Sequence, residues 1–240
     1  IPDFLANAGG VTCSYFEQVQ SNMNYYWEMD EVLGKLDVKM TAAYVAVSEM
    51  ARKRKLYMRD AAYIIAVEEI ARIDGSQAAT LAAGHSLGIY PIDTFGSEAQ
   101  RRKYLPELCQ GKSLMGFGLT EPNAGSDAGA TNTSAVKEGD AWVINGRKTM
   151  TTNANTPMTK GSIVQAVTGV RPDGRPEYTC FIVENGTPGF SLNTLKRKLM
   201  WRGSNTAELI FEDVEVPFEN VLGEEGRGVA NILEMVALTR

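Results

Sequence analysis

The hydrophobic pattern of this 240-residue chain changes its period near Gly111. Before Gly111, apolar residues recur at the spacing of an amphipathic helix, as they do over residues 37–55. After it, short runs of alternating apolar and polar residues are separated by turn sequences about every 8 to 12 residues. The pattern predicts an α+β fold, with N-terminal helices to about Leu108, a β-barrel-like domain over residues 113–222 and the start of a final helix.

Four turn sequences punctuate the second half of the chain. They are Asn145-Gly146, Pro172-Asp-Gly174, Asn185-Gly186 and Pro188-Gly189. An Asn-Gly step between alternating strands is the strongest short signal for a hairpin, so we expect a hairpin turn at Asn145-Gly146. The spacing of these turns suits a barrel or a sandwich.

The first half of the chain reads as helices with one early interruption. The Gly9-Gly10 step predicts either a strand-to-helix turn or a close approach of the backbone to a ligand. One helix follows over residues 37–55, another runs from Met58 to about Ser76, and a third covers residues 98–108. The residues expected to face inward are Leu36, Met40, Ala43, Tyr44, Val47, Met50 and Ala51 on the first of these helices and Tyr104, Leu105 and Leu108 on the last.

Charge and composition exclude several classes of protein. A formal net charge of −5 predicts no nucleic-acid partner, and the basic run Arg52–Lys55 reads as a solvated helix end. No apolar run reaches the roughly 18 residues of a membrane span. Cys13, Cys109 and Cys180 lack metal-ligand spacing, so we expect free thiols and no metal site. His85, the single histidine, is expected to be a packing or surface residue.

The stretch from Gly116 to Asp127 reads as a strand that ends in a tight loop. Pro122 disfavours a helical conformation for the residue before it. Gly125 allows a positive φ, and the side chains of Ser126 and Asp127 can bond back onto a turn. Such a loop can present amides and hydroxyls to a phosphate or a polar heteroaromatic ring. An ordinary strand-to-turn corner is the alternative.

Three motifs, in this order, resemble the acyl-CoA dehydrogenase family of flavoproteins. They are Thr120-Glu-Pro-Asn-Ala-Gly-Ser-Asp127, then Asn145-Gly-Arg-Lys-Thr-Met-Thr-Thr-Asn153, then the run from Arg202-Gly-Ser-Asn-Thr206 through Phe211 to Val216-Pro217. The resemblance covers about residues 67–240. It implies that residues 67–112 end an N-terminal helical domain, that residues 113–222 form a β-barrel middle domain that binds flavin and acyl-CoA, and that residues 223–240 begin a C-terminal helical domain.

By position, the resemblance implies a set of contacts to FAD. Ser126 would also lie by the acyl-CoA chain, and Arg240 corresponds to a substrate-binding arginine that follows the first helix of the C-terminal domain. Met150 stands where many members have Trp or Phe, so a core methionine is the alternative there, and a strand hydroxyl without a ligand is the alternative for Thr152. The implied FAD contacts are Phe117, Leu119, Thr120, Gly125, Ser126, Met150 and Thr152.

The implied reaction is α,β-dehydrogenation of an acyl-CoA thioester with hydride transfer to FAD. No catalytic base is identifiable, because Thr239 stands where a subgroup of the family carries it and Glu234 reads as a solvated residue. The base is expected in a C-terminal region beyond this chain, so the chain alone is expected to be inactive. The resemblance also implies electron-transfer flavoprotein as electron acceptor, a homo-oligomer that is usually a tetramer, and the cytoplasm or, in a eukaryote, the mitochondrial matrix.

Residues 1–66 resemble a different family, at the C-terminal end of glutamate dehydrogenase. The words Ala6-Asn-Ala-Gly-Gly-Val11 and Ser14-Tyr-Phe-Glu17 carry this resemblance. It implies that Asn7 lies near a nicotinamide and that Ser14 meets the side-chain carboxylate of the substrate. The segment is mostly helical by pattern and has no Gly-x-Gly-x-x-Gly fingerprint.

The two resemblances meet near residues 63–69, so the chain looks chimeric. A fusion, an assembly error in a sequence source and an engineered helix splice would each produce such a junction. Two alternatives to a partial acyl-CoA dehydrogenase therefore remain. One is a glutamate dehydrogenase fragment, from an NAD(P)-dependent oxidative deaminase, and the other is a non-catalytic chimera without a cofactor.

Overall fold

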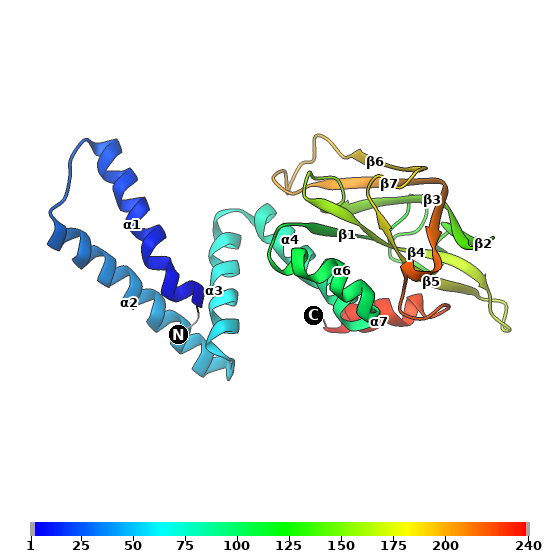
Figure 1. Cartoon of the computed structure of the whole chain (residues 1–240), viewed down its shortest axis with the longest axis horizontal. Coiled ribbons are helices and arrows are strands. Elements are labelled where there is room, and N and C mark those ends of the chain that lie inside the picture. Colours follow the sequence, from blue (N-terminus) through cyan, green and yellow to red (C-terminus); the bar gives the residue numbers. More distant parts are fainter. Residues whose placement is uncertain (1–2, 239–240) are drawn as a thin grey trace. The chain divides into compact units, whose positions relative to one another are not determined.

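The computed structural model describes residues 3–238, which belong to two compact units (Figure 1). The first unit ends at Ile73 and the second begins at Asp74. The predicted junction near residue 66 falls inside a single helix, α3, Met58–Ile73.

The first unit consists of three helices. They are α1, Asp3–Met23, α2, Met29–Arg54, and α3. Their small core consists of Leu5, Val47, Ala51, Ala61 and Ala62. On α2 the predicted apolar face is confirmed for Val47 and Ala51, which are buried, whereas Tyr44 was wrongly placed inward and is 43% exposed.

The predicted interruption at Gly9-Gly10 is wrong, because α1 continues through both glycines. A side chain at either position would meet no protein atom within 4 Å, so no close approach of another protein segment explains them. Each glycine costs a helix about 1 kcal/mol relative to alanine. Burial of Leu5 before them and Phe16 after them offsets this cost.

Asp74 separates the helices of the two units along the chain. Its side chain accepts a hydrogen bond from Ser76 N at 2.8 Å and caps α4, Gly75–Ala83. The helix predicted from Met58 to Ser76 therefore ends three residues early, because an Asp before a helix satisfies an otherwise free backbone donor.

The second unit begins with helices, two of which start at capping residues of the sequence. After α4 come a π-helical segment, Gly84–Ile89, then α5, Tyr90–Phe95, and α6, Glu98–Cys109. Ser97 and Gln100 form a capping box at the start of α6. Tyr104 and Leu108 are buried as predicted, with Leu105 packed beside them, and His85 is an exposed residue, also as predicted. The final helix is α7, Gly228–Leu238.

The strands of this unit form one mixed sheet (Figure 1). The strand order is β6-β7-β3-β2-β4-β5-β8, and β1 pairs with β4. Strands β1 and β2 both run parallel to β4, whereas the other pairs are antiparallel. The strands are β1 Leu114–Gly118, β2 Ser134–Glu138, β3 Ala141–Thr152, β4 Thr159–Val170, β5 Pro176–Glu184, β6 Phe190–Thr194, β7 Thr206–Pro217 and β8 Val221–Leu222. The predicted α+β fold is confirmed.

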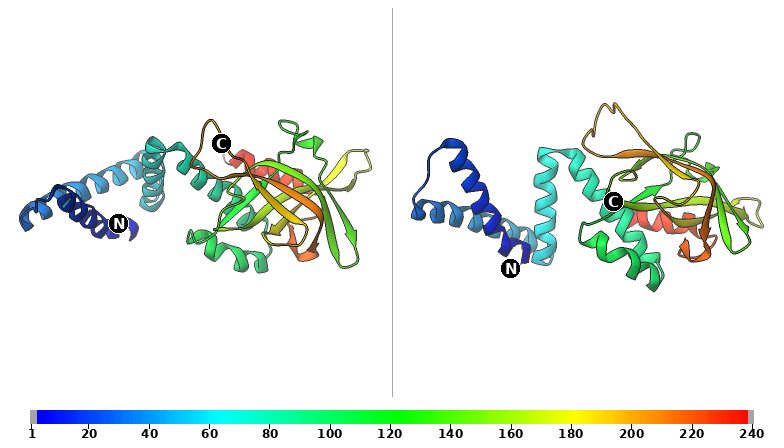
Figure 2. Two further views of the ribbon diagram at one scale, coloured as in Figure 1. Left: turned by 90° about the horizontal axis from the view of Figure 1, so that it is seen from above. Right: turned by 45° about the horizontal axis from the view of Figure 1, so that its top comes forward.

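The sheet curves around its own core, as a barrel-like domain does (Figure 2). Side chains from β2 through β7 meet in this core, with Trp142 and Phe181 in edge-to-face contact at 5.4 Å between ring centroids. Strand β5 is buried on both faces. Phe181 and Val183 face the sheet core, and Cys180 and Ile182 pack in a second core with the helices.

The hairpin predicted at Asn145-Gly146 is wrong, because β3 runs unbroken through this step. The hairpin instead joins β2 and β3, where Glu138 pairs with Ala141. Gly146 has φ +144° at a register shift in the pairing of β3 with β7. An Asn-Gly step suits any site that needs a positive φ, and here it stands opposite a β-bulge of β7, where Glu212 and Asp213 face the single residue Asn145. The turns predicted at Gly174, Gly186 and Gly189 are confirmed, each with positive φ between strands.

The bulge is fixed by a reciprocal pair of hydrogen bonds. Asn145 Nδ2 donates to Asp213 Oδ1 at 2.9 Å, and Asp213 N donates to Asn145 Oδ1 at 2.9 Å. Asp213 itself has φ +50°. The two strands therefore bend at the same level, which lets β3 and β7 curve together.

Replacing Gly146 tests the bulge. A Cβ there would lie 2.6 Å from Thr133 Oγ1 and 2.7 Å from Thr133 Cα. We expect Gly146→Ala to lower the free energy of unfolding by at least about 2 kcal/mol more than the control Gly139→Ala. Gly139 has φ +57° with no atom near its Cβ position, so it carries the backbone cost alone. Urea denaturation measures both variants, and equal losses would mean that Gly146 lies in an open turn.

Candidate functional site

The end of β1 lies beside the second half of β3. Thr149 N donates to Thr120 O at 2.8 Å, and Lys148 Nζ donates to Leu119 O at 3.3 Å. These contacts place Thr120 next to the Met150–Thr152 segment, which forms the end of β3. The two motifs that supplied most of the predicted site residues are thus neighbours in space.

The predicted residues differ in their access to solvent. Phe117, Leu119, Thr120 and Thr152 are half-buried, and Phe117 and Leu119 pack against the helical core. Gly125, Ser126 and Met150 are exposed, and Gly125 does not adopt a positive φ. Asp127 does bond back onto its turn as predicted, accepting from Gly129 N at 3.0 Å. Arg240 and Thr239 lie outside the described residues.

A buried ion pair holds the Thr120 loop against β3. Lys148 Nζ lies 2.7 Å from Glu121 Oε1, and the two side chains are 0% and 2% exposed. Glu121 also accepts hydrogen bonds from Asn132 N at 2.7 Å and Thr133 N at 3.0 Å. One carboxylate therefore joins β3, the Thr120 loop and the segment that enters β2.

The charges of this pair are set by opposing effects. Burial would raise the pKa of the Glu121 carboxyl, but hydrogen bonds from Lys148, Thr133 and Asn132 outweigh it and hold the pKa below its ordinary value. Burial lowers the pKa of the Lys148 ammonium, and the contact with Glu121 opposes that shift. The short, fully hydrogen-bonded contact fits an ionised pair.

Met150 has an unusual backbone. It is 64% exposed, has φ +58° and lies at a second register shift of β3. Asn153 anchors the chain just beyond it, since its Nδ2 donates to Thr80 O at 2.9 Å and its N donates to Asn205 O at 3.1 Å. A left-handed apolar residue persists only where its surroundings hold it, and such positions gather at functional sites.

An exposed apolar segment lies between β6 and β7, directly before the third motif. Leu199, Met200 and Trp201 are all exposed. Lys198 Nζ holds the segment by donating to Ser204 O and, at 2.9 Å, to Thr206 Oγ1. Asn205 O accepts a hydrogen bond from Asn153 N at 3.1 Å, which links the segment to the end of β3. Exposed apolar side chains on a braced loop indicate a surface that binds something.

Glu121 and Lys148 are residues to which sequence reasoning assigned no role. Both stand inside the quoted motifs, and a signal for Lys148 was present. Lys148 lies four residues after the buried Ile144, and residues four apart in a strand point to the same face. A lysine on an inward face requires a buried partner, and the neighbouring motif offers two acidic residues, Glu121 and Asp127, of which Glu121 is the partner.

Asn7 and Ser14 both lie on α1 and are exposed. Within residues 3–238, no group of three or more His, Cys, Asp or Glu side chains could hold a metal ion. No helix among the searched residues is long and apolar enough to span a membrane.

Three family models match the chain. "Acyl-CoA dehydrogenase, N-terminal domain" matches residues 56–112 and "Acyl-CoA dehydrogenase, middle domain" matches residues 116–214. "Glutamate/Leucine/Phenylalanine/Valine dehydrogenase" matches residues 1–77. The first and last of these matches overlap over residues 56–77, which include all of α3.

Curated relatives include acyl-CoA dehydrogenases. The probable acyl-CoA dehydrogenase YngJ of Bacillus subtilis is 46% identical over 171 residues, which are 71% of this chain and 44% of that protein. The short-chain specific acyl-CoA dehydrogenase of Megasphaera elsdenii is 47% identical over 167 residues, 69% of this chain and 43% of that protein. The chain thus spans less than half of the length of these relatives.

Solved structures agree with these relatives. Butyryl-CoA dehydrogenase from Megasphaera elsdenii aligns with a TM-score of 0.71 at 33% identity, over 100% of this chain and 63% of that chain. An acyl-CoA dehydrogenase from Bacillus anthracis complexed with FAD aligns with a TM-score of 0.66 at 28% identity, over 98% of this chain and 41% of that chain.

Replacing Lys148 with Met tests the buried ion pair. The variant leaves the Glu121 carboxylate buried without its cation, which commonly costs about 3–5 kcal/mol of stability. We expect a much smaller loss from Lys160→Met, because Lys160 pairs with the exposed Glu107 at a similar 2.8 Å. Urea denaturation at pH 7 measures both. Equal losses in the two variants would contradict a structural role for the buried pair.

The pH dependence of stability gives a second readout. In the wild type the pKa of Glu121 is lowered, so its contribution is present above the unfolded pKa and is lost as pH falls. In Lys148→Met burial acts without the cation and raises that pKa, so the variant's deficit should shrink between pH 7 and pH 5. Adding Glu121→Gln should remove this pH dependence. A deficit that is constant with pH would contradict the assignment.

Proposed function

We propose that this chain, which belongs to the acyl-CoA dehydrogenase family over residues 56–214, forms the flavin- and acyl-CoA-binding half of an FAD-dependent acyl-CoA dehydrogenase. The observation that carries the proposal is the meeting of the Thr120 loop with Met150–Thr152 at the end of β3. Thr120 and Thr152 bring hydroxyl groups to this place, and Met150 brings an exposed apolar side chain.

The donors and the shape fit a polar heteroaromatic ring. Hydroxyl and amide groups at the ends of β1 and β3 can bond the edge of the ring, and the polarisable sulfur of Met150 can lie against its face. The braced Leu199–Trp201 segment supplies further apolar surface linked to the same strand end. FAD bound there would supply the hydride acceptor for α,β-dehydrogenation of an acyl-CoA thioester.

The residues of this chain would act mainly by binding and orientation. Phe117 and Leu119 precede the Thr120 loop and pack against the helical core. The Glu121–Lys148 pair holds that loop against β3. Thr120 and Thr152 would donate hydrogen bonds to polar atoms of the ring edge, where negative charge develops during reduction. Gly125 and Ser126, on the exposed turn, are proposed to lie by the flavin and the acyl-CoA chain.

No catalytic base is assigned among the described residues. Near the proposed flavin face, Glu121 is buried in its ion pair and Asp127 accepts from a backbone amide. Glu234, on α7, is exposed. Arg240 stays a proposed substrate-binding residue. The chain spans less than half of its relatives' length.

The partners of the reaction are proposed on the same grounds. The substrate is an acyl-CoA, and electron-transfer flavoprotein is the proposed electron acceptor. A relative in Acetobacterium woodii is named as a subunit of a caffeyl-CoA reductase-Etf complex. A homotetramer is proposed for the assembled enzyme. The cytoplasm or the mitochondrial matrix is the proposed compartment, with mitochondrial isovaleryl-CoA dehydrogenases among the relatives. The alternative of a glutamate dehydrogenase fragment concerns only residues 1–77 and is not favoured.

The proposal predicts FAD binding and turnover once a C-terminal domain is present. The chain would be extended with the remaining C-terminal part of the Megasphaera elsdenii short-chain enzyme and titrated with FAD by flavin absorbance. We expect the extended chain to bind FAD and to oxidise butyryl-CoA with an artificial electron acceptor, and the unextended chain to show no turnover. Turnover by the unextended chain would contradict the missing base.

Two variants of the extended chain test the proposed contacts. Thr120→Pro removes a backbone N–H donor. Thr152→Val replaces the hydroxyl with a methyl group of similar size. Each should weaken FAD binding by about tenfold, as expected for one lost hydrogen bond to a polar ligand. Thr187→Val, a hydroxyl removal in the β5–β6 turn, is the control. Unchanged FAD affinity in both test variants would show that Thr120 and Thr152 do not contact the flavin.

A further inference from the structure

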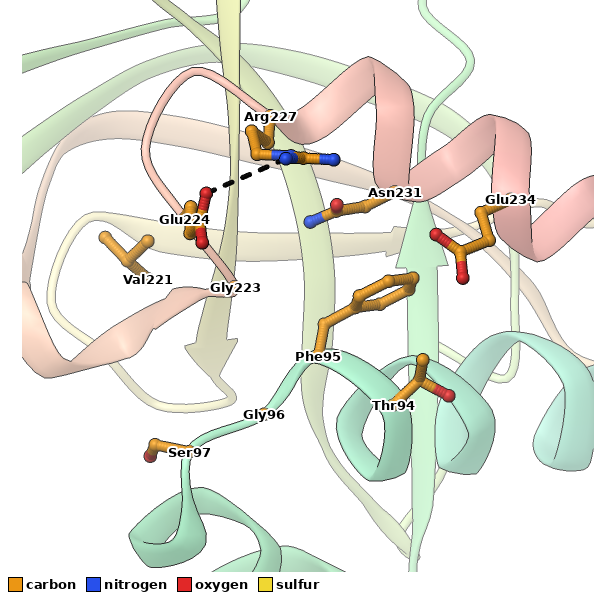
Figure 3. Close-up of a pocket in the computed structure, with 10 residues that line it drawn as sticks. All are labelled: Thr94, Phe95, Gly96, Ser97, Val221, Gly223, Glu224, Arg227, Asn231 and Glu234. Carbon is orange, nitrogen blue, oxygen red and sulfur yellow. Dashed lines mark ion pairs between the residues drawn. The ribbon is translucent and has the colours of Figure 1, made fainter.

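A cavity of about 520 Å³ lies where α5 and α6 meet the segment between β8 and α7 (Figure 3). It contains none of the residues assigned above to the flavin face, and its volume falls in the range of small-molecule sites. The residues that line it are Thr94, Phe95, Gly96, Ser97, Val221, Gly223, Glu224, Arg227, Asn231 and Glu234.

One stripe of α7 supplies the polar wall of this cavity. The helix Gly228–Leu238 has only two polar side chains, Asn231 and Glu234, and both line the cavity. With Arg227 in the turn before the helix, they recur at spacings of four and three residues, which places them on one face. The next residue, Ile232, packs instead in the helical core. The polar residues of α7 are therefore concentrated on the cavity.

The side chain of Asn231 is directed into this cavity and is mostly buried. Asn231 is 8% exposed, and no hydrogen bond of its side-chain amide occurs within the described part of the chain. Its Nδ2 lies against Gly223, since a Cβ on that glycine would be 2.7 Å away. Figure 3 shows the amide pointing from α7 into the space above Phe95. An amide that is mostly buried, has no partner among the described side chains and points into a cavity is available to bond a ligand there.

The charges of the residues that line the cavity indicate the charge of the ligand it would bind. Glu224 and Arg227 lie 3.9 Å apart and offset one another. Glu234 forms no ion pair among the described residues, which leaves one uncompensated carboxylate at the cavity. Its oxygens and the ring of Phe95 face the same space (Figure 3). A carboxylate beside an aromatic face attracts an organic cation, whereas Ca²⁺ or Mg²⁺ needs six or more oxygen ligands.

We propose that this cavity binds a small primary ammonium compound with an apolar body. The ammonium group would lie between Glu234 and the carbonyl oxygen of Asn231, over the ring of Phe95. The alkyl part would pack against Phe95 and Val221. The site is separate from the proposed flavin face, and its existence does not depend on the dehydrogenase function.

The experiment is an NMR titration of this chain with n-butylammonium chloride. The signals followed are the side-chain amide of Asn231 and the backbone amides of Gly96 and Gly223. We expect saturable shifts with n-butylammonium and none with sodium butyrate or sodium chloride at the same concentrations. Equal or larger saturable shifts with butyrate, or no saturable shift with either compound because only water occupies the cavity, would overturn the proposal.

Variants locate the binding groups. Glu234→Gln keeps the shape of the wall and removes its charge, and should weaken n-butylammonium binding by about tenfold, or 1.4 kcal/mol. Glu138→Gln removes an exposed carboxylate on β2, outside the cavity, and should leave binding unchanged. Asn231→Leu should abolish the shifts at Gly223 while the melting temperature stays the same or rises, because an unpartnered amide has been removed. Unweakened binding in Glu234→Gln would overturn the proposal whether or not Asn231→Leu folds.

Discussion

The buried contact between Glu121 and Lys148 is the constraint on which the proposed flavin site depends. An ammonium and a carboxylate out of contact with water are tolerated only when nearly every polar atom is satisfied. Glu121 meets this condition by accepting from two backbone amides as well as from Lys148. A single buried carboxylate thereby sets the positions of the Thr120 loop, β3 and the entry to β2. The pair is better understood as a device for position than as a source of stability.

The second constraint is that the middle of the sheet is covered on both sides. Alternate residues of β5 enter the sheet core and the helical core, so neither core can shift without the other. Tyr104 reinforces this link, since its hydroxyl donates to Glu184 at 2.8 Å at the end of β5. Burial raises the pKa of Tyr104 to about 12, with the Glu184 contact adding to the effect. The helices α5 and α6 are thus part of the same packed unit as the strands that carry the site residues.

The two family resemblances share a helix rather than a loop. The matches to the two families overlap over residues 56–77, and α3 is continuous from Met58 to Ile73. A helix is a permissive place for such a junction, because helical hydrogen bonds are local and do not depend on which family supplied each turn. The proposed dehydrogenase role belongs to the second unit. The first unit keeps a small core of its own around Ala61 and Val47.

The sequence by itself determined the α+β order, the change from helices to strands near Gly111, the inward face of α6 and the family motifs. These features depend on local periodicity, capping and turn chemistry, which act over a few residues. Only the tertiary structure decided the rest. Asn145-Gly146 lies opposite a bulge because β7 pairs along both halves of β3, and Gly9-Gly10 stayed helical because residues on either side are buried. Lys148 contacts Glu121, and Asn231 lines a cavity, because the fold brings together segments that are far apart in the chain. A local pattern states what a residue tolerates, but burial and partners are properties of the assembled fold.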